Sequence, residues 1–295
     1  MYTVIKNENY GYTVTTYGDY VVASNPDLLR WDAASSSVLH TGSIDYFRYN
    51  KNTDQHDYIG TIYKRIEEIE SLLVTEDANL SPTGPTASIR TETPGIVVAT
   101  QNRDLNIDKD LYTASVDDGF GLSLDMYGKL LVVGSPYFTQ IVMTSASVIT
   151  ASGGTVEVHN LGLTELGSTQ SCYIQTLYNP HSTITESFGR GVSVNNYWVA
   201  VGSPEVSSSK GMVYMYRSFG TGSNYSWSFY QMIDAPSGSI DECRFGWDLK
   251  LNKQSGSYSQ SMVVGCGNSA NAQAYYYEMI TGSWVLTHTF YPTTD

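Results

Sequence analysis

An internal repeat constrains the fold of this chain more than any other feature. Three segments align without gaps: residues 10–26 (YGYTVTTYGDYVVASNP), 120–136 (FGLSLDMYGKLLVVGSP) and 188–204 (FGRGVSVNNYWVAVGSP). In each of them an aromatic residue and a glycine are followed by a proline fifteen residues after that glycine. A fourth copy begins at Phe245-Gly246, carries six extra residues and has Gly267 in place of the proline. Such self-similarity predicts one structural unit that is built several times over.

Each copy has the pattern of two β-strands joined by a tight turn. Apolar and polar residues alternate over 121–126, as in a strand with one buried face. A turn at 127–129 is followed by an apolar run, which Gly134-Ser135-Pro136 ends. Two further strand patterns follow each copy, such as 154–159 and 173–177 in the second. Because four antiparallel strands cannot bury both faces of their own sheet, the units are expected to pack around a common axis.

We therefore expect an all-β fold, a β-propeller of four-stranded antiparallel blades with four clear blades and a fifth, degenerate one. A single β-propeller domain is expected over 1–295. The first interval between aromatic-Gly pairs is 110 residues, whereas the next two are 68 and 57, so 65–115 holds a degenerate blade or an insertion. Within it, 65–73 has the pattern of a short helix and 95–99 that of a strand.

These repeats resemble the FG-GAP repeats of integrin-α-like β-propellers, which are named for a Phe-Gly pair followed by Gly-Ala-Pro. The matching elements here are Phe120-Gly121, Phe188-Gly189, Phe245-Gly246, Gly134-Ser135-Pro136 and Gly202-Ser203-Pro204. Blades of this family often carry an Asp-rich calcium loop between the first two strands. The short turns of this chain cannot supply the several oxygen ligands that calcium needs. The closer match is the short-turn bacterial and viral form of the repeat, and no metal or cofactor is implied.

Composition and charge exclude several classes of partner. The chain has 24 Tyr residues, and Tyr suits a half-buried sheet surface. A formal net charge of −13 argues against nucleic acid and anionic membranes as partners, because phosphates require a surface rich in Lys and Arg. No stretch approaches the length of a membrane span, so no membrane insertion is expected.

Cysteine usage and the N-terminus bear on the cellular compartment. Cys172, Cys243 and Cys266 are odd in number and widely spaced, so we expect neither a disulfide framework nor a zinc site. No signal peptide is visible at the N-terminus. The expected localisation is a virion or an extracellular surface, and otherwise the cytoplasm.

No catalytic residue is predicted. Ser135 and Ser203 lie in Gly-Ser-Pro turns and not in a nucleophile elbow. The five histidines are scattered, and His159 is expected to be a partly exposed strand residue.

The segment 139–152 is expected to be a loop on one rim. The candidate binding residues are aromatic side chains of the last two repeats: Tyr225, Trp227, Tyr230, Tyr275, Tyr277 and Trp284. Tyr and Trp dominate contacts with partners, and the alternative for these rings is packing between blades.

Two functions remain open at this level. The first is a non-catalytic structural or adaptor propeller that mediates protein–protein contacts in a larger assembly, specifically a virion component of a phage tail or neck. Its partners would be other proteins of the assembly, with a homo-oligomer as one form. The second is a receptor- or glycan-binding propeller that uses loops rich in Tyr and Trp.

Overall fold

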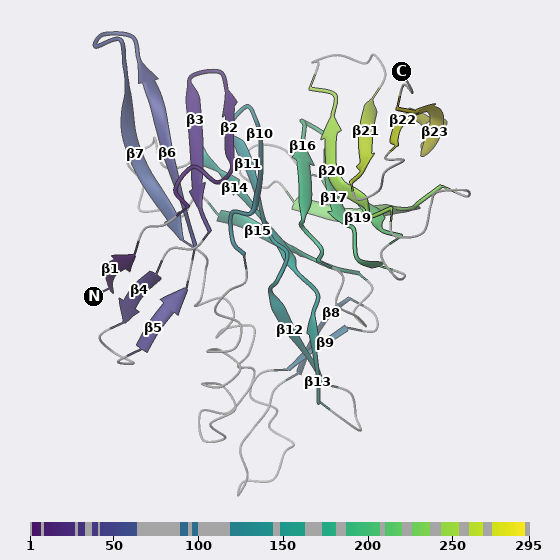
Figure 1. Ribbon diagram of the computed structural model, residues 1–295, viewed down its shortest axis with the longest axis horizontal. Coiled ribbons are helices and arrows are strands. Elements are labelled where there is room, and N and C mark those ends of the chain that lie inside the picture. Colours follow the sequence, from purple (N-terminus) through teal and green to yellow (C-terminus); the bar gives the residue numbers. More distant parts are fainter. Residues whose placement is uncertain are drawn as a thin grey trace, which may run out of the picture.

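In the computed structural model, the described part of the chain consists mainly of β-strands, which pair into sheets (Figure 1). The residues that the structure describes are 2–6, 9–26, 29–32, 37–40, 42–63, 89–93, 96–99, 119–143, 148–162, 173–180, 187–206, 210–219, 226–236, 243–253, 260–267 and 273–292. The all-β fold class expected from the sequence is confirmed for this part of the chain.

Four sheets share one plan, in which four antiparallel strands pair in chain order. Sheet I contains β2 (Val14–Tyr17), β3 (Tyr20–Asn25), β6 (Ser43–Asn50) and β7 (Gln55–Tyr63). Sheet II contains β10 (Ser123–Tyr127), β11 (Leu130–Ser135), β14 (Thr155–Asn160) and β15 (Tyr173–Tyr178). Sheet III contains β16 (Gly191–Val194), β17 (Trp198–Ser203), β18 (Met212–Phe219) and β19 (Ser226–Asp234). Sheet IV contains β20 (Phe245–Leu251), β21 (Ser261–Cys266), β22 (Ala274–Ile280) and β23 (Ser283–Phe290). Each repeat copy in the sequence therefore forms the first two strands of one such sheet, as predicted.

Two further sheets come from segments inserted between these strands. The hairpin of β4 (Leu29–Asp32) and β5 (Ser37–His40) lies between β3 and β6 in the sequence and pairs with β1 (Tyr2–Lys6). The hairpin of β12 (Thr139–Met143) and β13 (Val148–Ser152) lies at the matching point of sheet II, between β11 and β14. It pairs with β9 (Ile96–Ala99), and β9 pairs with β8 (Ile89–Thr93). Both additional sheets lie below the four repeated sheets in the view of Figure 1.

The second inserted hairpin corrects one expectation from the sequence. The loop predicted over 139–152 is wrong, because its two halves are rich in β-branched residues and form β12 and β13. The strand predicted at 95–99 is confirmed as β9, which extends this hairpin. The described part of 65–115 thus contributes β8 and β9 to a shared sheet. The helix predicted at 65–73 and the extra residues 254–259 of the fourth copy lie outside the described residues.

Equivalent irregularities occur in all four repeated sheets. The pairing of the third and fourth strands shifts at one repeat position, next to Phe47, His159, Tyr216 and Tyr277 in sheets I to IV. A bulge of this kind adds a residue to one strand and increases the local twist. Its recurrence shows that the repeat extends over the whole sheet and not only over the motif that is visible in the sequence.

The turn around the aromatic-Gly pair is likewise the same in every repeat. The residue before the aromatic side chain has a positive φ: 61° at Asn9, 70° at Gly119, 50° at Ser187 and 55° at Arg244. In the first repeat the amide of Tyr12 donates to the carbonyl of Asn9 over 3.0 Å, and the other three repeats have the same hydrogen bond. The motif glycine has a φ of 80° at Gly11 and of 88° to 93° in the other repeats. Non-glycine residues rarely adopt that region, so the backbone itself requires this glycine.

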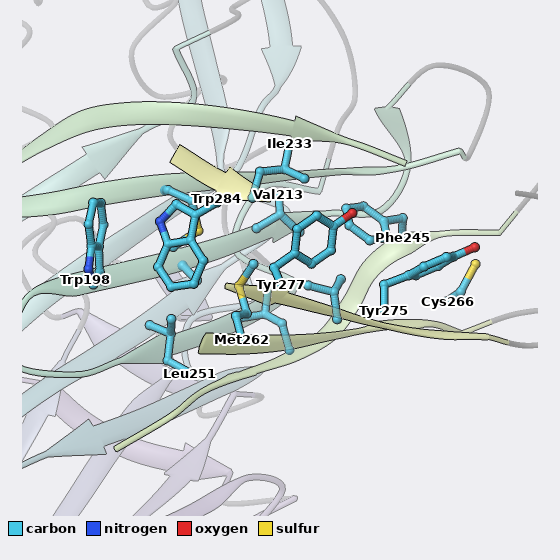
Figure 2. Packing of buried hydrophobic residues seen from close by; sticks show 14 of the residues in the cluster. Trp198, Val213, Ile233, Phe245, Leu251, Met262, Cys266, Tyr275, Tyr277 and Trp284 are labelled. Carbon is cyan, nitrogen blue, oxygen red and sulfur yellow. The ribbon is translucent and has the colours of Figure 1, made fainter. Parts of the chain in front are cut away.

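Apolar side chains are buried between consecutive sheets, in three clusters. We call the face of a sheet toward the preceding sheet its leading face, and the face toward the next sheet its trailing face. Between sheets I and II, Val22 and Ile44 of the trailing face pack with Phe120 and Leu124 of the leading face. The clusters between II and III and between III and IV are built in the same way. Figure 2 shows the last of them, where Trp198 and Val213 of sheet III lie among side chains of sheet IV.

Among the described strands, the four repeated sheets follow one another in chain order without closing into a ring. The first strands β2, β10, β16 and β20 contact one another in that order. In Figure 1 sheets I and IV stand at opposite sides of the molecule, with II and III between them. The four-stranded antiparallel sheets are thus established, and the described strands form an open array.

Two glycines of the repeat allow the backbones of neighbouring sheets to touch. A Cβ atom added to Gly134 would overlap the carbonyl oxygen of Gly189, and one added to Gly202 would overlap that of Gly246. The Gly-Ser-Pro glycine of one repeat therefore lies directly against the aromatic-Gly glycine of the next. In the first repeat another small residue, Ser24, takes this position beside Gly121. The contact between sheets explains the Gly-Ser-Pro glycine, and the positive φ explains the aromatic-Gly glycine.

A disulfide joins Cys243, which lies two residues before β20, to the last residue of β21, and this corrects a second expectation. Cys243 and Cys266 are bonded, and their Cα atoms lie 5.0 Å apart, within the usual range for disulfides. Cys266 ends β21 opposite Phe245 of β20. The expectation that the cysteines form no disulfide framework fails for this pair, because strand pairing brings together two residues that the sequence separates by 23 positions.

We predict that Gly202→Ala lowers the free energy of unfolding by about 2 kcal/mol, because the added methyl group meets backbone atoms that cannot move independently. Gly265→Ala is the matched control at the same position of sheet IV, where the nearest atom to an added Cβ is 3.4 Å away. That variant is expected to change stability by less than about 0.5 kcal/mol. Urea unfolding measures both values, and equal midpoints for the two variants would contradict the role assigned to the close approach.

Candidate functional site

One polar position of the repeat lies where the first strands of neighbouring sheets meet. It is the fifth residue after the aromatic residue of each repeat, and it is occupied by Thr15, Asp125, Ser193 and Lys250. These residues lie in β2, β10, β16 and β20, the strands through which consecutive sheets contact one another (Figure 1). The same position therefore recurs at every junction between neighbouring sheets.

Asp125 is the centre of this cluster and is 1% exposed. Its Oδ2 accepts hydrogen bonds from the Ser193 hydroxyl at 2.7 Å and from the Val194 amide at 2.9 Å. Its Oδ1 accepts from Lys250 Nζ at 2.9 Å and from Lys253 Nζ at 2.7 Å. One carboxylate thus connects sheets II, III and IV.

The electrostatics of Asp125 define what it can do chemically. Burial raises the pKa of its carboxyl group, but the charges and hydrogen bonds of Lys250 and Lys253 more than offset this, so its pKa lies below the usual value. The group is therefore ionised at neutral pH and cannot serve there as a general acid. Both of its oxygens accept hydrogen bonds, which makes the cluster a clamp between strands.

A second buried polar pair lies on the leading face of sheet II. His159 Nε2 is 3.1 Å from Glu157 Oε2, and the two side chains are 1% and 2% exposed. The expectation that His159 is partly exposed is wrong, because its strand β14 pairs Leu131 with His159 and Val133 with Glu157 on the face that sheet I covers. Its strand position was predicted correctly.

Two of the predicted binding residues, Trp227 and Trp284, join the outer strands of neighbouring sheets. The Gln175 side chain of sheet II accepts from the Trp227 amide at 2.8 Å and donates to the Trp227 carbonyl at 3.0 Å. Gln231 of sheet III makes the same pair of bonds with Trp284 of sheet IV, at 2.8 and 3.1 Å. Both indoles are buried. The structure therefore places these two rings in the packing between sheets.

The other predicted binding residues do not form one exposed face. Tyr275 and Tyr277 are buried in the cluster between sheets III and IV (Figure 2), and Tyr230 is partly buried against the same cluster. The Tyr230 ring lies 4.8 Å from that of Trp198. Tyr225 lies outside the described residues. Except for Tyr225, the set thus belongs to the alternative role that the sequence left open, packing between sheets.

Exposed apolar side chains instead gather on the leading face of sheet I. Tyr10 is 47% exposed, whereas the equivalent Phe120, Phe188 and Phe245 are fully buried. Val14 is 64% exposed, whereas the residues at its position in the other three sheets are at most 5% exposed. The turn that carries Tyr10 nevertheless has the same backbone conformation and hydrogen bond as the buried ones. Sheet I therefore presents a preformed leading face that no described strand covers.

The trailing face of sheet IV is exposed at the opposite end of the array. Val263 is 38% exposed, whereas Val22, Val132 and Ala200 at the same repeat position are fully buried. In the strand pairing, Tyr276 lies opposite Val263 and His288 lies opposite Tyr276, so the three residues share one face of the sheet. Ala274 and Phe290 are aligned with Gly265 in the same way. Val285 and Phe290 are exposed as well. We call the leading face of sheet I and the trailing face of sheet IV the two terminal faces.

Reasoning from the sequence missed both terminal faces, although a signal was present. In the repeat alignment, Tyr10 and Val14 belong to the first copy, which has no copy before it to cover them. Val263 belongs to the fourth copy, which has no copy after it. The candidate binding residues were chosen because aromatic residues are dense in the last two repeats. This criterion does not separate buried from exposed positions, since Tyr and Trp in a strand pack in a core as well as on a surface.

Comparison with models of known protein families finds no match, and comparison with curated proteins finds none either. No helix among the described residues is long and apolar enough to span a membrane. Within the same residues, no group of three or more His, Cys, Asp and Glu side chains is arranged to hold a metal ion.

We predict that Asp125→Ala lowers the free energy of unfolding at pH 7 by about 2 to 3 kcal/mol, because it leaves the Ser193 hydroxyl and the Val194 amide unpaired. Lys250 is 56% exposed, and its share of this effect is reduced by solvent screening. Thr15→Ala, at the same repeat position of sheet I, is the control and is expected to cost less than about 1 kcal/mol.

The effect of Asp125 should also depend on pH. Because the folded-state pKa of Asp125 is lowered, its stabilisation is complete above the unfolded pKa of about 3.9 and is lost as the pH falls through the folded-state value. Urea unfolding of the wild type and Asp125→Ala from pH 7 to pH 2.5 measures this dependence. A stability difference that stays constant over that range would contradict the assignment.

Proposed function

We propose that this chain is a non-catalytic structural or adaptor protein of the β-propeller class, which mediates protein–protein contacts in a larger assembly. The observation that carries the proposal is the pair of exposed, apolar terminal faces on an otherwise tightly packed array. Exposed apolar side chains that gather on one face mark sites of interaction between proteins.

The blade architecture is supported by the repeat geometry. The four sheets carry the same strand order, the same bulge and the same aromatic-Gly turn, and their first strands lie side by side. Sheets related in this way are the units from which propellers are assembled. The resemblance to FG-GAP repeats and the short turns between the first two strands support a propeller of that type.

Rigidity suits such an array for a structural role. The backbone contacts at Gly134 and Gly202, the Asp125 cluster and the two Gln–Trp pairs hold consecutive sheets in one register. The buried carboxylate of Asp125 takes part in these contacts between sheets, and that of Glu157 lies 3.1 Å from His159 within sheet II. The specific form of the proposal is a component of a virus particle, such as a phage tail or neck, as the short-turn repeat and the Tyr-rich composition suggest.

The proposal predicts that the chain is found at a fixed stoichiometry in particles purified from its native source. Val14→Asp places a charge on the leading face of sheet I and should reduce incorporation at least tenfold, as measured by quantitative mass spectrometry of the purified particles. Phe219→Asp, which changes a side chain of similar exposure elsewhere in sheet III, is the control and should incorporate normally. Finding the wild-type chain only as a free monomer would remove the proposal.

A further inference from the structure

The contacts between consecutive sheets are directional, which gives the two terminal faces a specific relationship. In each junction the leading face contributes the aromatic-Gly pair, and the trailing face contributes the glycine or serine that it lies against. The three junctions I–II, II–III and III–IV repeat this arrangement with equivalent residues. A sheet therefore has two unlike faces, and each fits the opposite face of another sheet.

The terminal faces are the two unused halves of that junction. Sheet I has the leading half, with Tyr10, Gly11 and Val14 exposed at positions that are buried in sheets II to IV. Sheet IV has the trailing half, where an added Cβ on Gly265 would meet no atom closer than 3.4 Å and Val263 is exposed. In the internal junctions the corresponding glycines touch the next sheet directly.

We infer that the leading face of sheet I binds the trailing face of sheet IV of a second copy of this chain, by the contact that joins sheets within one copy. This inference rests on the proposed function and names the partner of its terminal faces. The Tyr10-Gly11 turn already has the conformation of the buried turns, so little ordering is needed on binding. Because the two faces are unlike, the contact is heterologous and builds a ring or an open chain of copies.

The contact between copies lacks one feature of the junctions II–III and III–IV. Position 288, which corresponds to Gln175 and Gln231 in the register of the outer strands, is a histidine. On the other side, His56 of sheet I corresponds to Trp227 and Trp284. Because those bonds go to the main-chain amide and carbonyl of the Trp residues, the new junction lacks only the glutamine side chain, as does junction I–II, where Gly60 has this position. Association is therefore expected to be reversible. His288→Gln restores the acceptor and donor of the clamp.

The first experiment measures molar mass by light scattering over a range of protein concentrations. The wild type should associate, and Val14→Asp and Val263→Asp should each raise the concentration of half-association at least tenfold. Phe219→Asp should behave as the wild type, and His288→Gln should lower that concentration several-fold. A wild type that stays monomeric at every concentration overturns the inference, as does association that both Asp variants retain.

A mixing experiment then tests the direction of the contact. Val14→Asp keeps an intact trailing face, and Val263→Asp keeps an intact leading face, so a one-to-one mixture of the two should form heterodimers and nothing larger. A mixture that stays monomeric overturns the head-to-tail arrangement. Unfolding midpoints of both variants, compared with that of the wild type, establish that each remains folded.

Cysteine cross-linking distinguishes contacts between copies from contacts within one chain, in a Cys172→Ser background. Mixing Val14→Cys chains with Val263→Cys chains should give a cross-linked dimer. If a chain carrying both substitutions instead cross-links as a monomer, the two faces meet within one copy and the inference is wrong. If the purified chain is monomeric while Val14→Asp still loses its place in native particles, the inference fails and the proposed function stands.

Discussion

Direct contact between the backbones of consecutive sheets is the constraint on which the rest of this structure depends. Where Gly134 meets Gly189 and Gly202 meets Gly246, the absence of side chains lets two sheets approach more closely than any Cβ would allow. That approach sets the separation at which Phe188 and Phe245 fill the space between the sheets. Interiors are packed at crystal-like density, so a junction set at one end also fixes the register of the whole sheet.

Around this contact the junctions are layered by polarity. The middle of each junction is apolar. Between sheets II, III and IV a buried carboxylate also holds the first strands, and Gln–Trp hydrogen bonds join the fourth strands. Buried polar groups stabilise an arrangement only where they are satisfied, and they penalise alternatives that leave them unpaired. Asp125 and the two glutamines therefore favour one alignment of neighbouring sheets, which the apolar layer alone would specify less strictly.

A junction built from unlike faces has a consequence for any array of a limited number of sheets. Either the last trailing face meets the first leading face, or both remain exposed. The exposed Tyr10, Val14 and Val263 show that both remain exposed in the single chain. The features that stabilise the interior thus also generate the surfaces on which the proposed function depends, and no separate binding site has to be added to the fold.

The sequence by itself determined the strands and turns of the four repeated sheets, because alternation of side chains and the positive φ of glycines are local properties. It could not determine which members of the repeat are exposed. Tyr10 and Phe120 occupy the same position in the same turn, and only the presence or absence of a preceding sheet separates an exposed ring from a buried one. The Cys243–Cys266 bond and the burial of Trp227 and Trp284 were likewise decided by contacts between distant strands. Exposure and pairing depend on neighbours in space, and only the tertiary structure supplies these.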